Sequence, residues 1–248
     1  MRTIFTAISP YRGPAWNEAD VSDKPAWVQA LPLLSQSRIN HIDELRIETY
    51  QVLESEDDAV NTLVAALKAT GQLRRTMFVF ASDNGAQWGE HRLTGKIAPY
   101  EESIRVPLIV RYDPLTSTPR ADDHLVANID YAPTFADLAG VSNLASGAEG
   151  TSLMPLLASP TASWRNDFLV EHLNDGGAND KVPTYCEVRA VGYNYVKYQT
   201  GEEELYDLTQ DPNQLQNVAS DPSYASTLDA MRSEEQRLCD PPPPGFVP

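Results

Sequence analysis

Residues 78–110 read FVFASDNGAQWGEHRLTGKIAPYEESIRVPLIV, and this stretch decides the fold. It begins within one short apolar run, TMFVFAS (76–82), and ends within another, RVPLIVRY (105–112), and in neither run do polar and apolar residues alternate. Strands of that kind are covered on both faces, as in the parallel sheets of α/β proteins. We therefore predict two buried central strands of a mostly parallel sheet, joined by a polar loop.

The flanking sequence extends the α/β pattern. From about residue 39 to residue 69, apolar residues recur at three- and four-residue steps among many acids, which predicts a long helix that Gly71 ends. The segment IDYAPTFADLAGV (129–141) predicts a second helix, with Asp130 at its N-cap and Gly140 at its C-terminal end. Helices that alternate with buried strands indicate an α/β domain.

After Gly150 the pattern changes to short alternating strands separated by turns. The strand segments are WRNDFLVEHL, CEVRAVGYNYVKYQT and GEEELYDLTQDP, and a final amphipathic helix is expected over about 221–238. We therefore divide the chain into an α/β part, residues 1–160, and a smaller α+β part with a short antiparallel sheet and a proline-rich tail, residues 161–248.

Composition narrows the classes of partner. The formal net charge of -16 disfavours binding to nucleic acid or to anionic membranes. No apolar run reaches the length of a membrane span, and the first 14 residues contain too short an apolar run for a secretory signal. The two cysteines, Cys186 and Cys239, form no Cys-x-x-Cys motif, and the sequence leaves open whether they pair.

Polar residues follow the first predicted strand directly. Asp83 and Asn84 would lie beyond its carboxyl end, where α/β sheets bind ligands, and Gly85 permits a sharp turn. Their oxygens suit Ca²⁺ or Mg²⁺, and Lys96 offers a point charge for a sulfate or phosphate group, with His91 in the same loop. By spacing alone, these residues also fit an ordinary turn, a packed histidine and a solvated lysine, so both interpretations stay open.

The run SDNG, GEH, GK and YEESIRVPLIV (82–110) resembles the sulfatase family of the alkaline phosphatase superfamily. The resemblance is collinear from about residue 14 to the C-terminus and is strongest to arylsulfatase-type and glucosamine-sulfatase-like members. Its further segments are NEADVSDKPAWV (17–28), DDAV (57–60), NIDYAPTFADLAGV (128–141), GTSLMPLL (150–157) and ELYDLTQDPNQLQNVA (204–219). It implies an alkaline-phosphatase-like core in residues 1–160 and the family's small C-terminal sheet in residues 161–248.

The resemblance also implies roles for single residues. Asp83 and Asn84 match the family's second pair of metal ligands, usually for Ca²⁺, with Mg²⁺ as the other candidate. Lys96 matches the lysine that contacts the substrate sulfate, and His91 stands at the GEH position near the active site. The implied activity is metal-dependent hydrolysis of a sulfuric ester, with a sulfated small molecule or glycan as substrate.

Two parts of the family's site have no counterpart in this sequence. The formylglycine nucleophile arises from a Cys/Ser-x-Pro-x-x-Arg motif, but Cys186 is followed by EVRA and Cys239 by DPPPP. The first acidic pair of metal ligands is also absent. We therefore expect an incomplete metal site, no activity of the chain by itself, and a missing N-terminal half as its partner.

Two other functions remain open. One is a phosphoester or phosphonate hydrolase of the same superfamily, and the other is a non-catalytic sulfatase remnant. Members of the family are usually secreted, periplasmic or lysosomal, whereas this sequence shows no signal peptide, so its localisation stays undecided.

Overall fold

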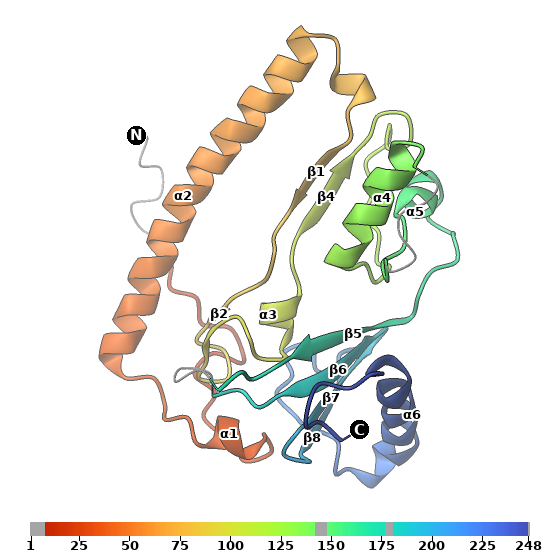
Figure 1. Cartoon of the computed structure of the whole chain (residues 1–248). Coiled ribbons are helices and arrows are strands. Elements are labelled where there is room, and N and C mark those ends of the chain that lie inside the picture. The colour runs from red at the N-terminus through yellow and green to blue at the C-terminus, as the bar shows by residue number, and fades with distance from the viewer. Residues whose placement is uncertain (1–7, 142–147, 177–180, 248) are drawn as a thin grey trace.

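The structure is a computed structural model that describes residues 8–141, 148–176 and 181–247. A long helix, α2, runs along one side of a two-stranded ladder, β1 and β4, and helices α4 and α5 lie on the other side (Figure 1). A four-stranded sheet, β5 to β8, lies below them with α6 packed beside it (Figure 1). No helix in the described part of the chain is both long and apolar enough to cross a membrane.

The helices are α1 (Ala26–Gln29), α2 (Gln36–Ala69), α3 (Glu101–Ile104), α4 (Tyr131–Leu138), α5 (Met154–Ala158) and α6 (Ala225–Leu238). Short 3-10 turns are η1 (Leu73–Arg75), η2 (Asn128–Asp130) and η3 (Pro222–Tyr224). The strands are β1 (Phe78–Ala81), β2 (Gln87–Trp88), β3 (Thr94–Gly95), β4 (Leu108–Arg111), β5 (Asp167–His172), β6 (Tyr185–Ala190), β7 (Tyr193–Tyr198) and β8 (Glu203–Asp207).

Helix α2 confirms the predicted helix and begins three residues earlier than expected. The Ser35 side chain caps it by accepting a hydrogen bond from the Arg38 amide at 3.3 Å, and Gly71 follows its end with a φ of 69°. Ile42 is its buried residue, its other apolar residues are half-buried or exposed, and the exposed ones include Leu45, Val52, Leu53 and Leu63. Several large apolar side chains of this helix are thus accessible to solvent.

Helix α4 also confirms its prediction, with a different use of the capping residue. Asp130 occupies the N-cap and Gly140 follows the helix with a φ of 71°. The Asp130 carboxylate makes no hydrogen bond to the first turn of α4; it accepts from the Ala127 and Thr151 amides and pairs with Arg165 at 2.6 Å. This buried ion pair fixes the start of α4 against the segment that leads into β5.

The two apolar runs form strands, but the predicted strand direction is wrong for the described residues. Strands β1 and β4 pair antiparallel, with Phe78 opposite Arg111, and the other described sheets are antiparallel as well. A short apolar run indicates burial and contains nothing that fixes the direction of its neighbour. The prediction of a mostly parallel sheet is therefore not met in this part of the chain.

The predicted burial of both strands is also wrong. Strand β1 is half-buried, and β4 alternates between half-buried and exposed residues, with Ile109 63% exposed. The Ile109 face of the ladder has no covering layer within the described residues. An apolar run marks a strand that suits burial, but the covering elements must come from elsewhere in the fold.

The predicted C-terminal strands and final helix are confirmed as β5 to β8 and α6. The strands form an antiparallel meander in the order β5-β6-β7-β8. Helix α6 covers one face, where Leu228 and Met231 pack on Val188, Tyr195 and Leu205. The small antiparallel sheet expected in residues 161–248 is therefore present.

The other face of this sheet is covered by segments from early in the chain. Trp27 packs beside Val196 and Tyr198, and Tyr100 packs on Tyr206. The division at residue 160 stays a prediction, since the sheet and α6 lie after it while one covering layer comes from before it.

Two glutamates are fully buried on that second face. Glu204 accepts hydrogen bonds from the hydroxyls of Tyr100, Tyr198 and Tyr206 at 3.0, 2.5 and 2.6 Å. Burial raises the pKa of Glu204, and the three phenol hydrogen bonds act against that rise. Burial raises the pKa of Glu187 well above its usual value, and neither of its oxygens has a hydrogen-bond partner of good geometry among the described residues.

We expect Glu187→Gln to change how stability depends on pH. Because the pKa of Glu187 is higher in the folded state, the folded chain binds more protons there, and stability is lost as pH rises above the unfolded value of about 4.3. Glu187→Gln should remove this loss, so its free energy of unfolding at pH 8 should exceed that of wild type by on the order of 1 kcal/mol. Urea titrations at pH 5 and pH 8, with exposed Glu56→Gln as control, measure the difference. Equal pH dependence in wild type and Glu187→Gln would refute the expectation.

The structure joins the two cysteines, which the sequence left undecided. Cys186 on β6 and Cys239 after α6 form a disulfide across a sequence separation of 53 residues. Closing a loop of that length restricts the unfolded chain and stabilises the fold by about 4 kcal/mol.

The double substitution Cys186→Ala with Cys239→Ala should lower the free energy of unfolding by roughly that amount in a urea titration, whereas Ser226→Ala on the exposed side of α6 should lower it little. A loss below about 1 kcal/mol would show that the crosslink contributes little to the fold.

Candidate functional site

The loop beyond β1 holds two of the predicted metal ligands. Asp83 is exposed and Asn84 half-buried, and the Asp83 carboxylate accepts a hydrogen bond from the Asn84 amide at 2.9 Å. The Gly85 amide donates to the Ser103 carbonyl at 2.8 Å, and a Cβ on Gly85 would lie 2.0 Å from the Glu102 carbonyl. Only glycine permits this close approach. The backbone behind Asp83 and Asn84 is thus fixed against α3.

Lys96 lies beside Asn84. Strands β2 and β3 form a small hairpin, with Trp88 opposite Thr94, that turns the chain back toward β1. Lys96 follows the hairpin, and its ammonium donates a hydrogen bond to Asn84 Oδ1 at 2.9 Å. The structure therefore brings the ammonium of Lys96 to the side-chain oxygen of Asn84, although the two residues are 12 positions apart, and Asp83 is the residue directly before Asn84.

His91 has a different environment from Lys96. Its ring is fully buried and stacks on Tyr100 with ring centroids 4.2 Å apart. Nδ1 lies 2.7 Å from Glu18 Oε2, and Lys24 lies 3.7 Å from the other Glu18 oxygen. Nε2 has no hydrogen-bond partner among the described residues. These contacts place His91 in a buried charged cluster, and its catalytic role stays a prediction.

Contacts with the C-terminal sheet hold the segment that follows Lys96. The Tyr185 hydroxyl donates to the Ile97 carbonyl at 3.1 Å, and the Tyr100 hydroxyl donates to Glu204. The next residue, Glu101, pairs with Arg189 at 2.6 Å and its amide donates to Gln214 Oε1 at 2.7 Å.

Sequence reasoning missed these anchors. The ELYDL segment, which contains Glu204, indicated only the family's small C-terminal sheet and not the hydrogen-bond partners of Glu204. The useful signal was that Glu204 and Tyr206, two residues apart, share one face of the predicted strand, so that a carboxylate on that face needs donors if the face is buried.

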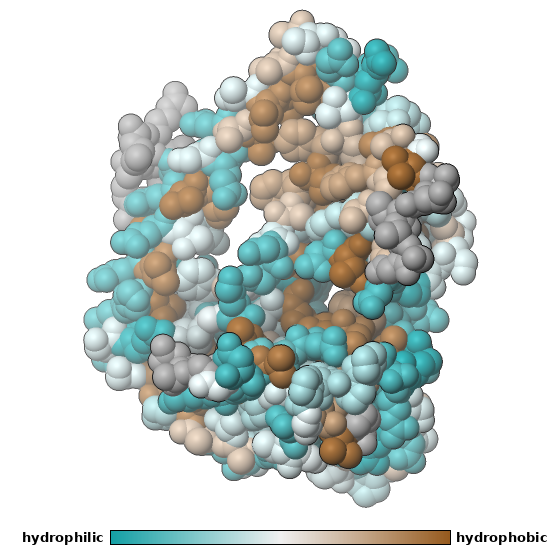
Figure 2. Space-filling view, in the orientation of Figure 1, coloured by the Kyte–Doolittle hydropathy of each residue, from teal (hydrophilic) through white to brown (hydrophobic). Residues whose placement is uncertain are grey.

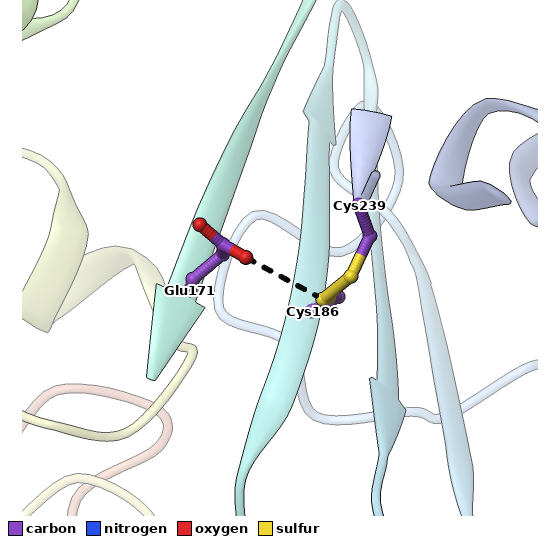
Figure 3. A group of neighbouring side chains, drawn as sticks. All are labelled: Glu171, Cys186 and Cys239. Atoms are coloured by element: carbon purple, nitrogen blue, oxygen red, sulfur yellow. Dashed lines mark hydrogen bonds between the residues drawn. A yellow bond between two sulfur atoms is a disulfide. The ribbon is translucent and has the colours of Figure 1, made fainter. Parts of the chain in front are cut away.

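The described residues contain one group of three His, Cys, Asp or Glu side chains that are close enough to hold a metal ion, and Asp83 is not in it. That group comprises Glu171, Cys186 and Cys239 (Figure 3), and its two sulfurs are joined in the disulfide. Asp83 and Asn84 supply two hard oxygens of the kind that Ca²⁺ prefers, but Ca²⁺ takes about six to eight ligands. They form at most part of a calcium site.

A cavity of about 880 Å³ lies elsewhere, between β4, the segment that follows it and α5. Arg74, Arg111 and Arg120 contribute to its wall, but Asp83, Asn84, His91 and Lys96 do not. Arg111 pairs with Asp113 and Arg120 with Asp122, so much of its positive charge is compensated. We base the candidate site on the chemistry of the Lys96 loop rather than on this cavity.

Comparisons with known proteins give matches along most of the chain. The family model described as Sulfatase matches residues 6–141, and the model described as N-sulphoglucosamine sulphohydrolase, C-terminal, matches residues 89–240. The arylsulfatase of Volvox carteri is 32% identical over 251 residues, covering 89% of this chain and 38% of that protein. Human N-acetylglucosamine-6-sulfatase is 33% identical over 222 residues, covering 77% of this chain and 40% of that protein.

Solved structures give the same result. The structure of BT4656 in complex with its substrate D-glucosamine-2-N,6-O-disulfate matches with a TM-score of 0.78 and 26% identity, covering 89% of this chain and 46% of that one. The phosphonate monoester hydrolase of Agrobacterium radiobacter matches with a TM-score of 0.74 and 25% identity, covering 94% of this chain and 52% of that one.

This chain thus spans about two fifths of the length of the curated relatives it matches, 38% and 40% for the two named above. The Sulfatase model covers more than half of the 248 residues, and the matched structures have the expected alkaline-phosphatase-like fold. The chain therefore belongs to the sulfatase family, whose members are hydrolases that act on sulfuric esters.

Proposed function

We propose that this chain supplies the C-terminal part of a metal-dependent sulfatase that hydrolyses sulfate esters of a glycan. The observation that carries the proposal is the hydrogen bond from Lys96 to Asn84, which places a cation beside one of the two predicted metal ligands beyond β1. In a protein with a net charge of -16, an anionic ester needs such a local positive centre.

Each residue has a role in this proposal. Lys96 binds a sulfate oxygen as a compact point charge. Asp83 and Asn84 hold Ca²⁺, or Mg²⁺, through their side-chain oxygens, and the bound cation supplies Lewis-acid polarisation of the sulfate group. The donor set fits a hard cation because it contains one carboxylate and one carboxamide. His91 orients the loop through its contacts with Glu18 and Tyr100.

The names of the relatives support a sulfated amino sugar as substrate. Human N-acetylglucosamine-6-sulfatase and the structure bound to D-glucosamine-2-N,6-O-disulfate both concern sulfated glucosamine. The match to a phosphonate monoester hydrolase favours a second candidate, hydrolysis of phosphonate monoesters on the same site. A non-catalytic role is the third candidate, because the printed sequence holds no Cys/Ser-x-Pro-x-x-Arg motif.

In this proposal, the remaining ligands and the nucleophile come from a polypeptide that corresponds to the part of the relatives that this chain does not match. Exposed apolar residues of α2 and β4, among them Val52, Leu63 and Ile109, offer a surface for it. In Figure 2, which has the orientation of Figure 1, an open gap separates helix α2 from strands β1 and β4, and hydrophobic residues lie along this gap. We propose that this polypeptide packs there and completes both the sheet and the metal site.

Complementation tests the enzyme proposal. The chain by itself should not hydrolyse nitrophenyl sulfate in calcium, whereas co-expression with a sulfatase N-terminal segment that carries the formylglycine motif should give activity. Lys96→Ala should then lower kcat/KM about 10²- to 10³-fold, because a charge that stabilises the reacting sulfate is lost. Lys68→Ala at the exposed end of α2 is the matched control. Robust turnover by the isolated chain, or an equal effect of both substitutions, would contradict the proposal.

Calcium dependence tests the role of Asp83. A cation that binds only the assembled site stabilises it by mass action, by about 2.7 kcal/mol at 100 times its Kd. In the co-expressed complex, calcium should raise the melting temperature relative to chelator, and Asp83→Ala should abolish most of that rise. Asp58→Ala, an exposed carboxylate on α2, should retain it. If calcium stabilises Asp83→Ala as much as wild type, Asp83 is not a metal ligand.

A further inference from the structure

A second group of ligating side chains lies on the face of the C-terminal sheet that α6 covers. Glu171, Cys186 and Cys239 face one another there (Figure 3), and one ligand atom from each lies within 4.8 Å of the others. Glu171 Oε1 is 3.9 Å from Cys186 Sγ. The two cysteines are 0% and 1% exposed, whereas Glu171 is exposed to solvent.

The backbone places these three side chains without help from the sulfur–sulfur bond. Glu171 on β5 and Cys186 on β6 are directly opposite each other in the ladder, so their side chains lie on the same face. Cys239 follows α6 as its C-cap, and its amide donates to the Glu235 carbonyl at 2.8 Å. The packing of α6 on Val188, Tyr195 and Leu205 holds Cys239 over that face.

We infer that reduction of the Cys186–Cys239 disulfide turns this cluster into a zinc site. A phosphine reductant breaks the S–S bond: the phosphine is oxidised to its oxide with an oxygen atom from water, and the two hydrogens of that water complete two thiols. Zn²⁺ then displaces both thiol protons and forms two Zn–S bonds and one bond to a Glu171 oxygen. Thiolates and carboxylates are zinc ligands at about 2.3 and about 2.0–2.2 Å, and water fills the fourth position on the exposed side.

The surroundings favour zinc over two free thiols. Leu169 and Phe246 pack against the cysteines and form an apolar shell, in which unpaired thiolates are costly but metal-bound thiolates are neutralised. Zinc would link β6 to the end of α6, the same two elements that the disulfide links. The C-terminal part of the chain thus has one crosslink for oxidising conditions and another for reducing conditions, independently of the sulfatase proposal.

Zinc titration of the reduced chain tests this inference. Since the sequence has only these two cysteines, reduction with a phosphine creates one dithiol per chain, which mass spectrometry confirms. Competition with a chromophoric chelator should then show one tightly bound Zn²⁺ per chain. The oxidised chain should bind at least a hundredfold more weakly, Glu171→Gln at least tenfold more weakly, and Cys186→Ser should lose the site. Glu56→Gln, an exposed glutamate on α2, should bind like wild type.

Circular dichroism in the same samples covers the case in which the reduced chain unfolds. If it does, zinc should restore the native spectrum to wild type but not to Cys186→Ser. The inference is overturned if the folded, reduced chain binds no zinc, if zinc fails to restore an unfolded one, or if oxidised and reduced chains bind zinc equally. The last outcome would assign the metal to surface carboxylates.

Discussion

Glu204 accepts three hydrogen bonds from tyrosine hydroxyls in the interior of the protein, and this cluster ties the two parts of the chain together. A buried carboxylate without donors would cost several kcal/mol, so its donors must arrive together when the chain folds. Tyr198 and Tyr206 come from the sheet itself, whereas Tyr100 comes from the loop that carries Lys96. The position of the candidate site therefore depends on a carboxylate more than a hundred residues away in sequence.

The face of the C-terminal sheet that carries Glu204, opposite α6, shows why polar residues occur in strands that are buried on both sides. Helix α6 covers one face with apolar contacts, but the other face meets backbone and polar groups of the Lys96 loop. The Tyr185 hydroxyl donates to the Ile97 carbonyl, and the Asn194 side chain donates to the Pro99 carbonyl. Arg189 pairs with the Glu101 carboxylate. Polar side chains in the strands thus serve as donors to the segment that runs from Ile97 to the first residue of α3.

Charge is arranged locally rather than globally. The chain is strongly acidic, yet Lys96 contacts a neutral carboxamide and forms no salt bridge within the part of the chain that the structure describes. Lys24, in contrast, is buried and lies near Glu18 and Asp23. Lys96 thus has no acidic partner among the described residues, as the proposed binding of an anion requires, while the charge of Lys24 is compensated within the fold.

The sequence by itself determined the family, the helices α2, α4 and α6, the strands β1 and β4 to β8, and the loop that carries Asp83, Asn84 and Lys96. These features depend on local periodicity and short motifs. Tertiary structure decided the antiparallel direction of β1 and β4, the burial of His91 against Glu18, the pairing of Cys186 with Cys239 and the donors of Glu204. His91 and its partner Glu18 are 73 residues apart in the sequence, and Glu204 and its partner Tyr100 are 104 residues apart. Periodicity within a window of a few turns cannot specify such pairs, since they form only when separate elements pack.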